Sequence, residues 1–153
     1  MVKFGWKKVV GTAMAALTLG TGLVGLSAGS ASAAVVGKVC DGWAVVTCTK
    51  IVPQGGHNVI ARATITDRDG GEDFKVKVEY LHMQRRVNGG AWANVKWNQD
   101  LGDGWRDEWD GADTSVYTCG PNTEVRSVAT FTWTGDQPEK QYGKITPCGP
   151  RRP

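Results

Sequence analysis

Histidine and cysteine, the residues that most often bind transition metals, are scarce in this sequence. Its 153 residues include two histidines, His57 and His82, and four cysteines, none of them in a C-x-x-C pair. Neither histidine lies near a cysteine pair, so the spacing typical of a zinc site is missing. We expect no cofactor.

The sequence also offers little catalytic machinery. No serine or acidic residue follows or precedes either histidine at a spacing that would suggest a triad. The adjacent carboxylates Asp107 and Glu108 would point to opposite faces of a strand and could not share a substrate. We therefore expect that the protein is not an enzyme, and a small extracellular hydrolase is the most distant alternative.

Helical periodicity is absent after residue 33, where apolar residues instead recur at every second position. This alternation predicts half-buried strands at 59–66 and from residue 74 onward. In the second strand the apolar positions shift by one residue after Tyr80, from Val78 and Tyr80 to Leu81 and Met83. Such a change of phase predicts a β-bulge near residues 80–82.

The pair Asn88-Gly89 predicts a tight hairpin, because these residues readily adopt the positive φ angles of primed turns. The return strand, 91–98, is expected to bury Val95 and Trp97 in the core.

Two more strand signals complete the pattern. A short strand is expected at Trp105–Trp109, and a final hairpin pairs 125–133, which includes a buried Trp133, with 141–146. Six or seven short strands separated by turns predict a single all-β domain, a β-sandwich, over residues 34–153.

The first 33 residues have the organisation of a secretory signal peptide. Three lysines precede an apolar stretch from Val9 to Leu26, and small residues ending in Ala33 follow it. An uncleaved membrane anchor is the alternative, although several glycines reduce the hydrophobicity of the stretch and no basic stop follows. We expect export, cleavage after Ala33 and an extracellular location.

Cleavage removes the excess of positive charge. The segment 1–33 holds three of the 18 basic residues and none of the 15 acidic ones, so the mature chain has 15 of each. A neutral chain gives no reason to expect binding to nucleic acid or to a membrane surface.

All four cysteines lie in the exported part, where disulfides persist, so two bridges are expected. The sequential pairs Cys40–Cys48 and Cys119–Cys148 are favoured, and the other two connectivities remain open. Cys119 and Cys148 are nearly symmetric about the last hairpin turn, which would place them opposite each other on neighbouring strands.

Several short motifs resemble those of known modules. Glu79-Tyr80, the segment 86–92 and the late strand at 125–128 are similar to the middle and penultimate strands of fibronectin-type-III-like and immunoglobulin-like modules. They are also similar to small secreted proteins of actinobacterial type. Tyr117, two residues before Cys119, resembles the tyrosine corner of immunoglobulin domains. The resemblance implies a sandwich architecture and no particular activity.

An immunoglobulin-like module would differ in its disulfide. Its bridge would join Cys48 to Cys119 across the two sheets, and its core tryptophan would follow Cys48 by about a dozen residues, where this sequence has none.

Tryptophan is abundant for a domain of this size, and it indicates one candidate ligand site. On the expected strand, Trp105, Asp107 and Trp109 would share a face, and Trp92 would lie on another strand. Indole rings with a carboxylate between them can stack on sugar rings and bond their hydroxyls. The alternative is that these rings fill the core.

Acidic loops indicate a second candidate site. The candidate calcium ligands are Asp67, Asp69, Asp100 and Asp103, from two loops expected at the same end of a sandwich. Neither loop has EF-hand spacing, and the alternative is that these residues are solvated turn formers.

Taken together, these observations predict a secreted, monomeric, non-enzymatic module that binds an extracellular protein or a cell-wall polysaccharide. A secreted inhibitor of proteases or glycosidases is the alternative.

Overall fold

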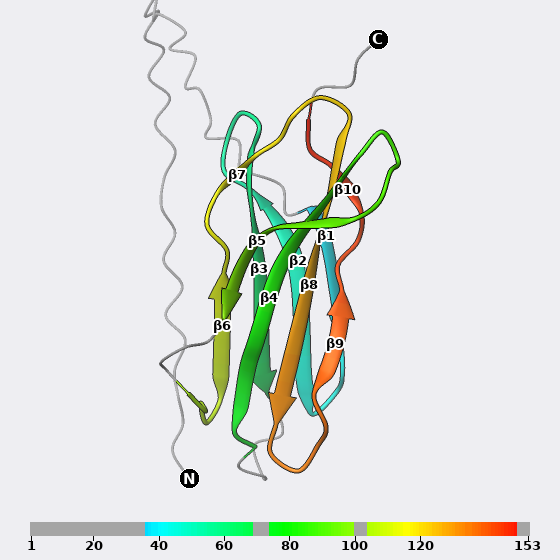
Figure 1. The fold of residues 1–153 in the computed structure, drawn as a ribbon. Coiled ribbons are helices and arrows are strands. Elements are labelled where there is room, and N and C mark those ends of the chain that lie inside the picture. The colour runs from blue at the N-terminus through cyan, green and yellow to red at the C-terminus, as the bar shows by residue number, and fades with distance from the viewer. Residues whose placement is uncertain (1–35, 69–73, 100–103, 150–153) are drawn as a thin grey trace, which may run out of the picture. The chain divides into compact units, whose positions relative to one another are not determined.

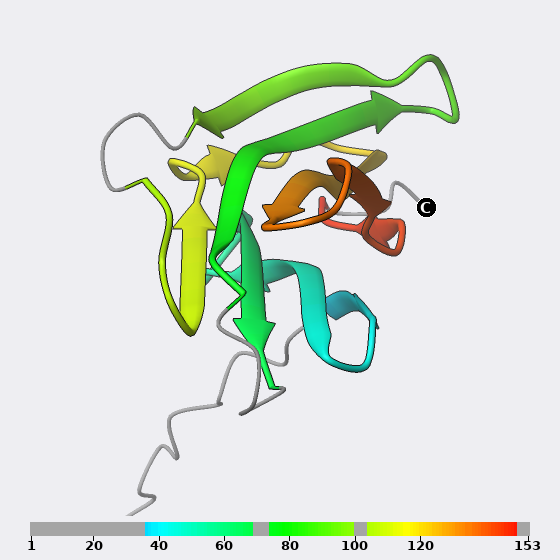
Figure 2. The ribbon, with the colours of Figure 1, turned by 90° about the horizontal axis from the view of Figure 1, so that it is seen from below.

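A computed structural model describes residues 36–68, 74–99 and 104–149, and in it these residues form two antiparallel β-sheets. Figure 1 looks onto one sheet, and Figure 2 shows the sheets from below as two layers. The prediction of an all-β, sandwich-like fold is confirmed. The expected signal peptide, residues 1–33, lies outside the described residues.

The first sheet has the strand order β1-β2-β3-β6, and the short strand β7 pairs with the start of β3. Its strands are β1 Val36–Asp41, β2 Val45–Pro53, β3 Asn58–Asp67, β6 Trp109–Asp113 and β7 Tyr117–Thr118. The second sheet has the order β10-β8-β4-β5, and β9 also pairs with β8. Its strands are β4 Val76–Val87, β5 Ala93–Gln99, β8 Thr123–Trp133, β9 Glu139–Tyr142 and β10 Thr146–Pro147.

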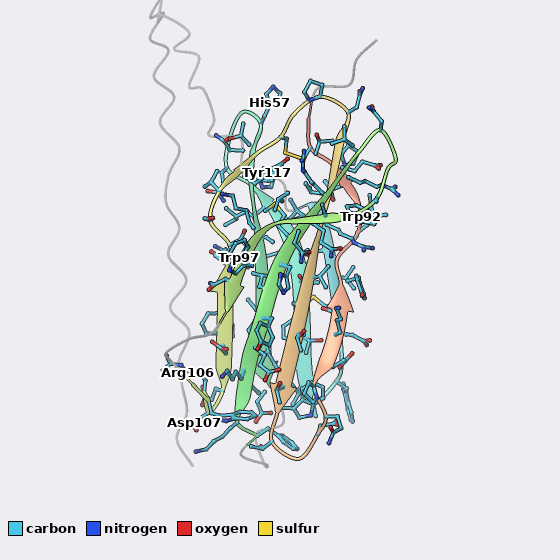
Figure 3. The ribbon with its side chains drawn as sticks, in the orientation of Figure 1. His57, Trp92, Trp97, Arg106, Asp107 and Tyr117 are labelled. Atoms are coloured by element: carbon cyan, nitrogen blue, oxygen red, sulfur yellow. A yellow bond between two sulfur atoms is a disulfide. The ribbon has the colours of Figure 1, made fainter. Side chains whose placement is uncertain are left out.

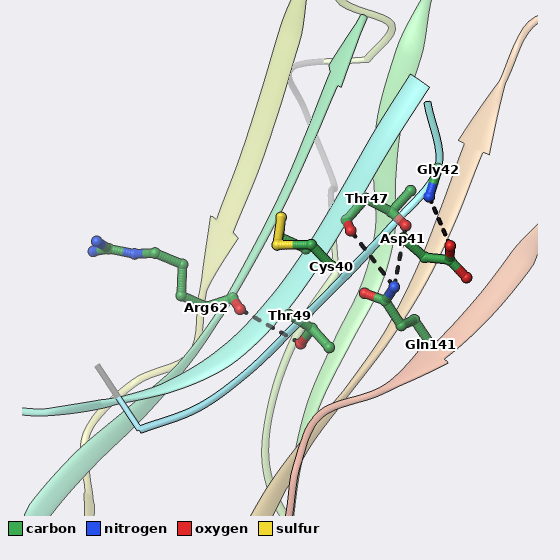
Figure 4. The surroundings of a disulfide bond; sticks show 8 residues. Cys40, Asp41, Gly42, Thr47, Thr49, Arg62 and Gln141 are labelled. Carbon is green, nitrogen blue, oxygen red and sulfur yellow. Dashed lines mark hydrogen bonds between the residues drawn. A yellow bond between two sulfur atoms is a disulfide. The ribbon is translucent and has the colours of Figure 1, made fainter. Parts of the chain in front are cut away.

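The inner faces of both sheets supply one hydrophobic core. Burial alternates along β3 as its sequence predicts, and the buried strand residues opposite come from β4 and β8. The largest fully buried apolar side chains are Ile51, Ile65, Leu81, Met83 and Phe131. Polar contacts also cross the core, because Gln141 of β9 donates from Nε2 to Oγ1 of Thr47 on β2 at 3.3 Å (Figure 4).

The predicted bulge in β4 is present, slightly earlier than expected. The register of β4 against β8 shifts between Val78 and Tyr80. Beside it lies Asp110 of β6, whose side chain is buried. Its Oδ2 accepts a hydrogen bond from the backbone N–H of Val78 at 2.6 Å, and its Oδ1 accepts one from the N–H of Gly111 at 2.7 Å. A carboxylate of the first sheet therefore bonds the backbone of the second.

The tight hairpin between β4 and β5 is confirmed. Asn88 and Gly89 have φ angles of 51° and 73°, the positive values that a primed turn requires. The N–H of Gly90 donates to the carbonyl of Val87 at 3.0 Å and closes the turn. The turn therefore fixes where β4 and β5 begin to pair.

The prediction that Trp97 is buried in the core is wrong. A second register shift, between Met83 and Gln84, changes the phase of β5, so that Trp97 pairs with His82 on the outer face of the sheet. Its side chain is 69% exposed. Val95 packs against the core, as expected.

Both favoured disulfides are present. Cys40 and Cys48 lie directly opposite each other on β1 and β2, with Cα atoms 4.1 Å apart. The expected placement of Cys119 and Cys148 on neighbouring strands of the last hairpin is wrong. Cys119 follows β7 of the first sheet and Cys148 follows β10 of the second, so their bond joins the two layers.

The two disulfides indicate an oxidising compartment such as the extracellular space. Within the described ranges, no helix has the length and hydrophobicity needed to cross a membrane.

Candidate functional site

Exposed tryptophans are the clearest candidates for ligand contact. Four side chains in the described part of the chain are about half exposed or more: Trp43 (93%), Trp97 (69%), Trp109 (55%) and Trp105 (47%). Trp133 packs against the core, as predicted. Single exposed indoles are common on protein surfaces, so each of these rings becomes a candidate only through the groups that surround it.

Trp109 lies in an open groove on the outer face of the first sheet. The groove has a volume of about 470 Å³ and is lined by residues of β2, β3 and β6. Gly111 leaves room for the indole beside the strand, because a Cβ there would lie 2.6 Å from two atoms of the Trp109 ring. The indole therefore rests against the glycine while more than half of its surface stays exposed.

An ion pair forms another wall of this groove. Arg62 of β3 and Asp113 of β6 are paired across the sheet, and both bonds of the pair, Nε to Oδ1 and Nη2 to Oδ2, are 2.6 Å long. The hydrogen bond to Asp113 raises the pKa of the Arg62 guanidinium above its ordinary value. The pair thus presents fixed donors and acceptors next to the indole.

Lys50 and Thr64 add an ammonium group and a hydroxyl to the lining. A planar apolar surface with a few fixed polar groups around it suits a ligand that has both a flat apolar face and a rim of hydroxyls. We call these residues, namely Lys50, Arg62, Thr64, Trp109, Gly111 and Asp113, the Trp109 groove.

The expectation that Trp105, Asp107 and Trp109 share one strand face is wrong. Arg106 exchanges two backbone hydrogen bonds with Val76 of β4, at 2.8 and 3.0 Å, whereas β6 begins only at Trp109 and pairs with β3. The chain therefore passes from one sheet to the other between these points (Figure 3). Of the three predicted residues, Trp109 alone belongs to the groove.

Trp92 lies at the other sheet, just before β5 (Figure 3). Its ring is in contact with two guanidinium groups, those of Arg86 at 4.8 Å and Arg126 at 4.3 Å. Trp92 and Trp109 thus belong to different surfaces, and the four predicted ligand residues are not brought together.

Most of the predicted calcium site cannot be placed. Asp69, Asp100 and Asp103 lie outside the described residues, while Asp67 ends β3. The N–H of Asp67 donates to the carbonyl of Glu108 at 2.9 Å, so parts of the two acidic segments are adjacent. No cluster of three or more metal-ligating side chains occurs among the residues that are described, and calcium binding stays a prediction.

The two histidines lie apart. His57 is exposed in the turn between β2 and β3, and His82 is on the outer face of β4. In the described ranges neither imidazole hydrogen-bonds to a serine or a carboxylate. The Nδ1 atom of His82 is buried without a hydrogen-bond partner.

Sequence reasoning found Trp109 but missed the other members of its groove. One signal was available: Trp109, Gly111 and Asp113 alternate with Asp110 and Ala112, as residues on one face of a strand do. The partner strand that supplies Arg62 could not be identified from that pattern.

No protein-family model matches this chain, and a search of curated proteins finds no significant match. The interpretation of the groove therefore rests on its own geometry.

Proposed function

We propose that this protein is a secreted, non-enzymatic binding module that holds extracellular polysaccharide in the Trp109 groove. The observation that carries the proposal is the half-exposed indole of Trp109 resting on Gly111 beside the Arg62–Asp113 pair. A sugar ring stacks its C–H face on the indole, and its hydroxyls bond to the guanidinium, the carboxylate and the Lys50 ammonium.

The proposed fold family is that of immunoglobulin-like and fibronectin-type-III-like sandwiches. If β2, β3, β4, β5, β6, β8 and β9 are taken as strands A, B, C, C′, E, F and G, one sheet reads A-B-E and the other C′-C-F-G. The chain then crosses from the first sheet to the second between strands B and C, as in these modules. The tyrosine corner fits less well, since Tyr117 lies in β7, before the strand taken as F.

Export is part of the same proposal. It is supported by the signal-like sequence of residues 1–33 and by the two disulfides, which persist outside the cytoplasm. Peptide mass analysis of the secreted protein should find an N-terminus at or next to Ala34.

Replacing the indole should abolish most of the binding. We expect Trp109→Ala to weaken retention on insoluble peptidoglycan, chitin or cellulose, whichever the native protein binds, by about tenfold or more, as for aromatic anchors that become buried when a ligand binds. The thermal unfolding midpoint should change little, because the side chain is 55% exposed in the free protein. Sedimentation with the polymer gives the bound fraction.

Trp43→Ala is the matched control, since this tryptophan is 93% exposed and lies in the turn between β1 and β2, outside the groove. Equal losses in the two variants would indicate nonspecific adhesion of indoles and contradict the proposal. Inhibition of a protease or glycosidase by the native protein, without retention on any of the polymers, would favour the inhibitor alternative.

The position of the ring should matter as well as its presence. In Gly111→Ala the new Cβ would lie 2.6 Å from the indole, so the ring must swing away from the strand. We expect binding to weaken several-fold although Trp109 is retained and the fold is intact. The indole N–H resonance of Trp109, assigned by its loss in Trp109→Ala, should shift in the NMR spectrum; an unmoved resonance would contradict the proposed ring position.

A further inference from the structure

A line of cationic and aromatic side chains crosses the outer face of the second sheet. The Arg126 guanidinium lies 4.3 Å from the centre of the Trp92 ring and 4.9 Å from that of Tyr142. Arg86 lies over Trp92 at 4.8 Å, and the Lys140 ammonium lies over Tyr142 at 5.6 Å. We call these five residues the cation–aromatic row.

Arg126 is held in position by a relay of hydrogen bonds as well as by the two rings. Its Nε donates to Oε1 of Gln84 at 2.9 Å, and Nε2 of Gln84 donates to Oδ1 of Asn94 at 2.9 Å. The guanidinium is thus fixed from β4, β9 and the segment that leads into β5. A guanidinium fixed in this way loses little further entropy when it binds a ligand.

The charge of Arg126 is not neutralised within the described part of the chain. Arg86 is paired with Glu124 at 2.6 Å, and Arg62 with Asp113 at 2.6 Å, but no carboxylate of the described residues reaches Arg126. Lys140 contributes a second cation nearby. Since contact with the rings and one bond from Nε leave the terminal N–H groups available, Arg126 can form two parallel bonds to an oxyanion.

The same face offers flat surfaces for sugar rings. Trp97, His82, Val128 and Tyr142 are paired in a straight row across β5, β4, β8 and β9. Three strand spacings separate the ends of this row, about 14 Å. Trp97 is 69% exposed and Tyr142 47%. Exposed aromatic side chains therefore stand at both ends of this row, with Tyr142 belonging to the cation–aromatic row as well.

We propose that the cation–aromatic row is a second binding site, specific for an anionic glycan, in which Arg126 binds a carboxylate or phosphate group of the polymer. Trp92 and Tyr142 position the guanidinium, and Lys140 attracts the next negative charge along the chain. The site lies on the second sheet, whereas the Trp109 groove lies on the outer face of the first, so the two can act independently.

The test measures binding of the mature protein to polygalacturonate, to fully methyl-esterified polygalacturonate and to poly(glycerol phosphate). We expect the ester to bind at least about tenfold more weakly than the acid, because it lacks the oxyanion that forms charge-assisted bonds. The tighter of the two anionic polymers identifies the oxyanion as carboxylate or phosphate. Raising ionic strength from about 0.1 to about 1 M should weaken binding, since the Debye length falls from about 10 to about 3 Å.

Arg126→Ala should weaken binding of the anionic polymer about tenfold or more, and Arg126→Lys, which keeps the charge but not the planar fork, should lie in between. Lys38→Ala, with the same change of charge on β1 of the other sheet, should have little effect. Trp109→Ala should leave this binding unchanged, which separates the second site from the first. Equal binding of acid and ester, full binding by Arg126→Ala, or no binding of either anionic polymer would overturn the proposal.

Discussion

Asp110→Ala should cost this protein about 3 kcal/mol of folding free energy, a large share of the 5–15 kcal/mol typical of a small domain. Asp110 is 3% exposed, and its carboxylate accepts hydrogen bonds from the backbone N–H groups of Val78 and Gly111. The first of these belongs to the other sheet, at the bulge of β4. Without the carboxylate, the buried N–H of Val78 and the partly buried N–H of Gly111 lose their acceptor. An unsatisfied buried donor costs about 1–3 kcal/mol, and the loss of the second hydrogen bond adds about 1 kcal/mol.

Urea unfolding followed by far-UV circular dichroism measures this loss. Asp110→Asn should lose less, because one oxygen remains to accept a bond while the amide group opposes the second N–H. Asp113→Ala is the control on the same strand: its ion pair with Arg62 is about 40% exposed, and such pairs contribute about 0–1 kcal/mol. If Asp110→Ala were no less stable than Asp113→Ala, the link between the sheets would contribute little to stability.

The buried face of a strand could be predicted where apolar and polar residues alternate along the sequence. The alternation along β3 and the change of phase in β4 follow from which side chains must leave water, and the hairpin follows from the positive φ angles at Asn88 and Gly89. Each of these features depends only on residues that are close in the sequence, so the sequence alone is enough to predict it.

The orientation of β5 could not be predicted in the same way. Its sequence has no break in alternation, yet a register shift against β4 at Met83 and Gln84 turns Trp97 outward. A bulge depends on both strands of a pair, and the partner's register is not visible in one strand's pattern. The abundance of tryptophan was nevertheless informative, because most of these rings lie on the surface.

The candidate sites depend on contacts between distant strands, which a sequence pattern does not contain. Arg62 meets Asp113 only because β6 pairs with β3, 51 residues earlier in the chain. Arg126 meets Trp92 and Tyr142 because β8 lies between β4 and β9. The prediction placed Trp105 and Asp107 with Trp109 because they are close in sequence, and the change of sheet after Arg106 separates them.

Removal of the Cys119–Cys148 bond should destabilise the protein more than removal of Cys40–Cys48. In the chain-entropy account, the separations of 29 and 8 residues correspond to about 3.6 and about 2.5 kcal/mol. The structure adds a second reason. Cys119 is buried and its bond joins the ends of β7 and β10, strands of two residues each in different layers, whereas Cys40–Cys48 reinforces two strands that are already paired.

The double variants Cys119→Ala/Cys148→Ala and Cys40→Ala/Cys48→Ala, compared by urea unfolding, test this order. The Cys119→Ala/Cys148→Ala variant should also lose protection from hydrogen exchange at the backbone N–H groups of positions 119 and 148. In the native protein these groups bond to the carbonyls of His57 and Thr123. The Cys40→Ala/Cys48→Ala variant should leave those groups protected, because the bond between Cys119 and Cys148 stays intact. An equal or greater loss of stability in the Cys40→Ala/Cys48→Ala variant would contradict both the order expected from loop length and the stabilising role of the bond between the layers.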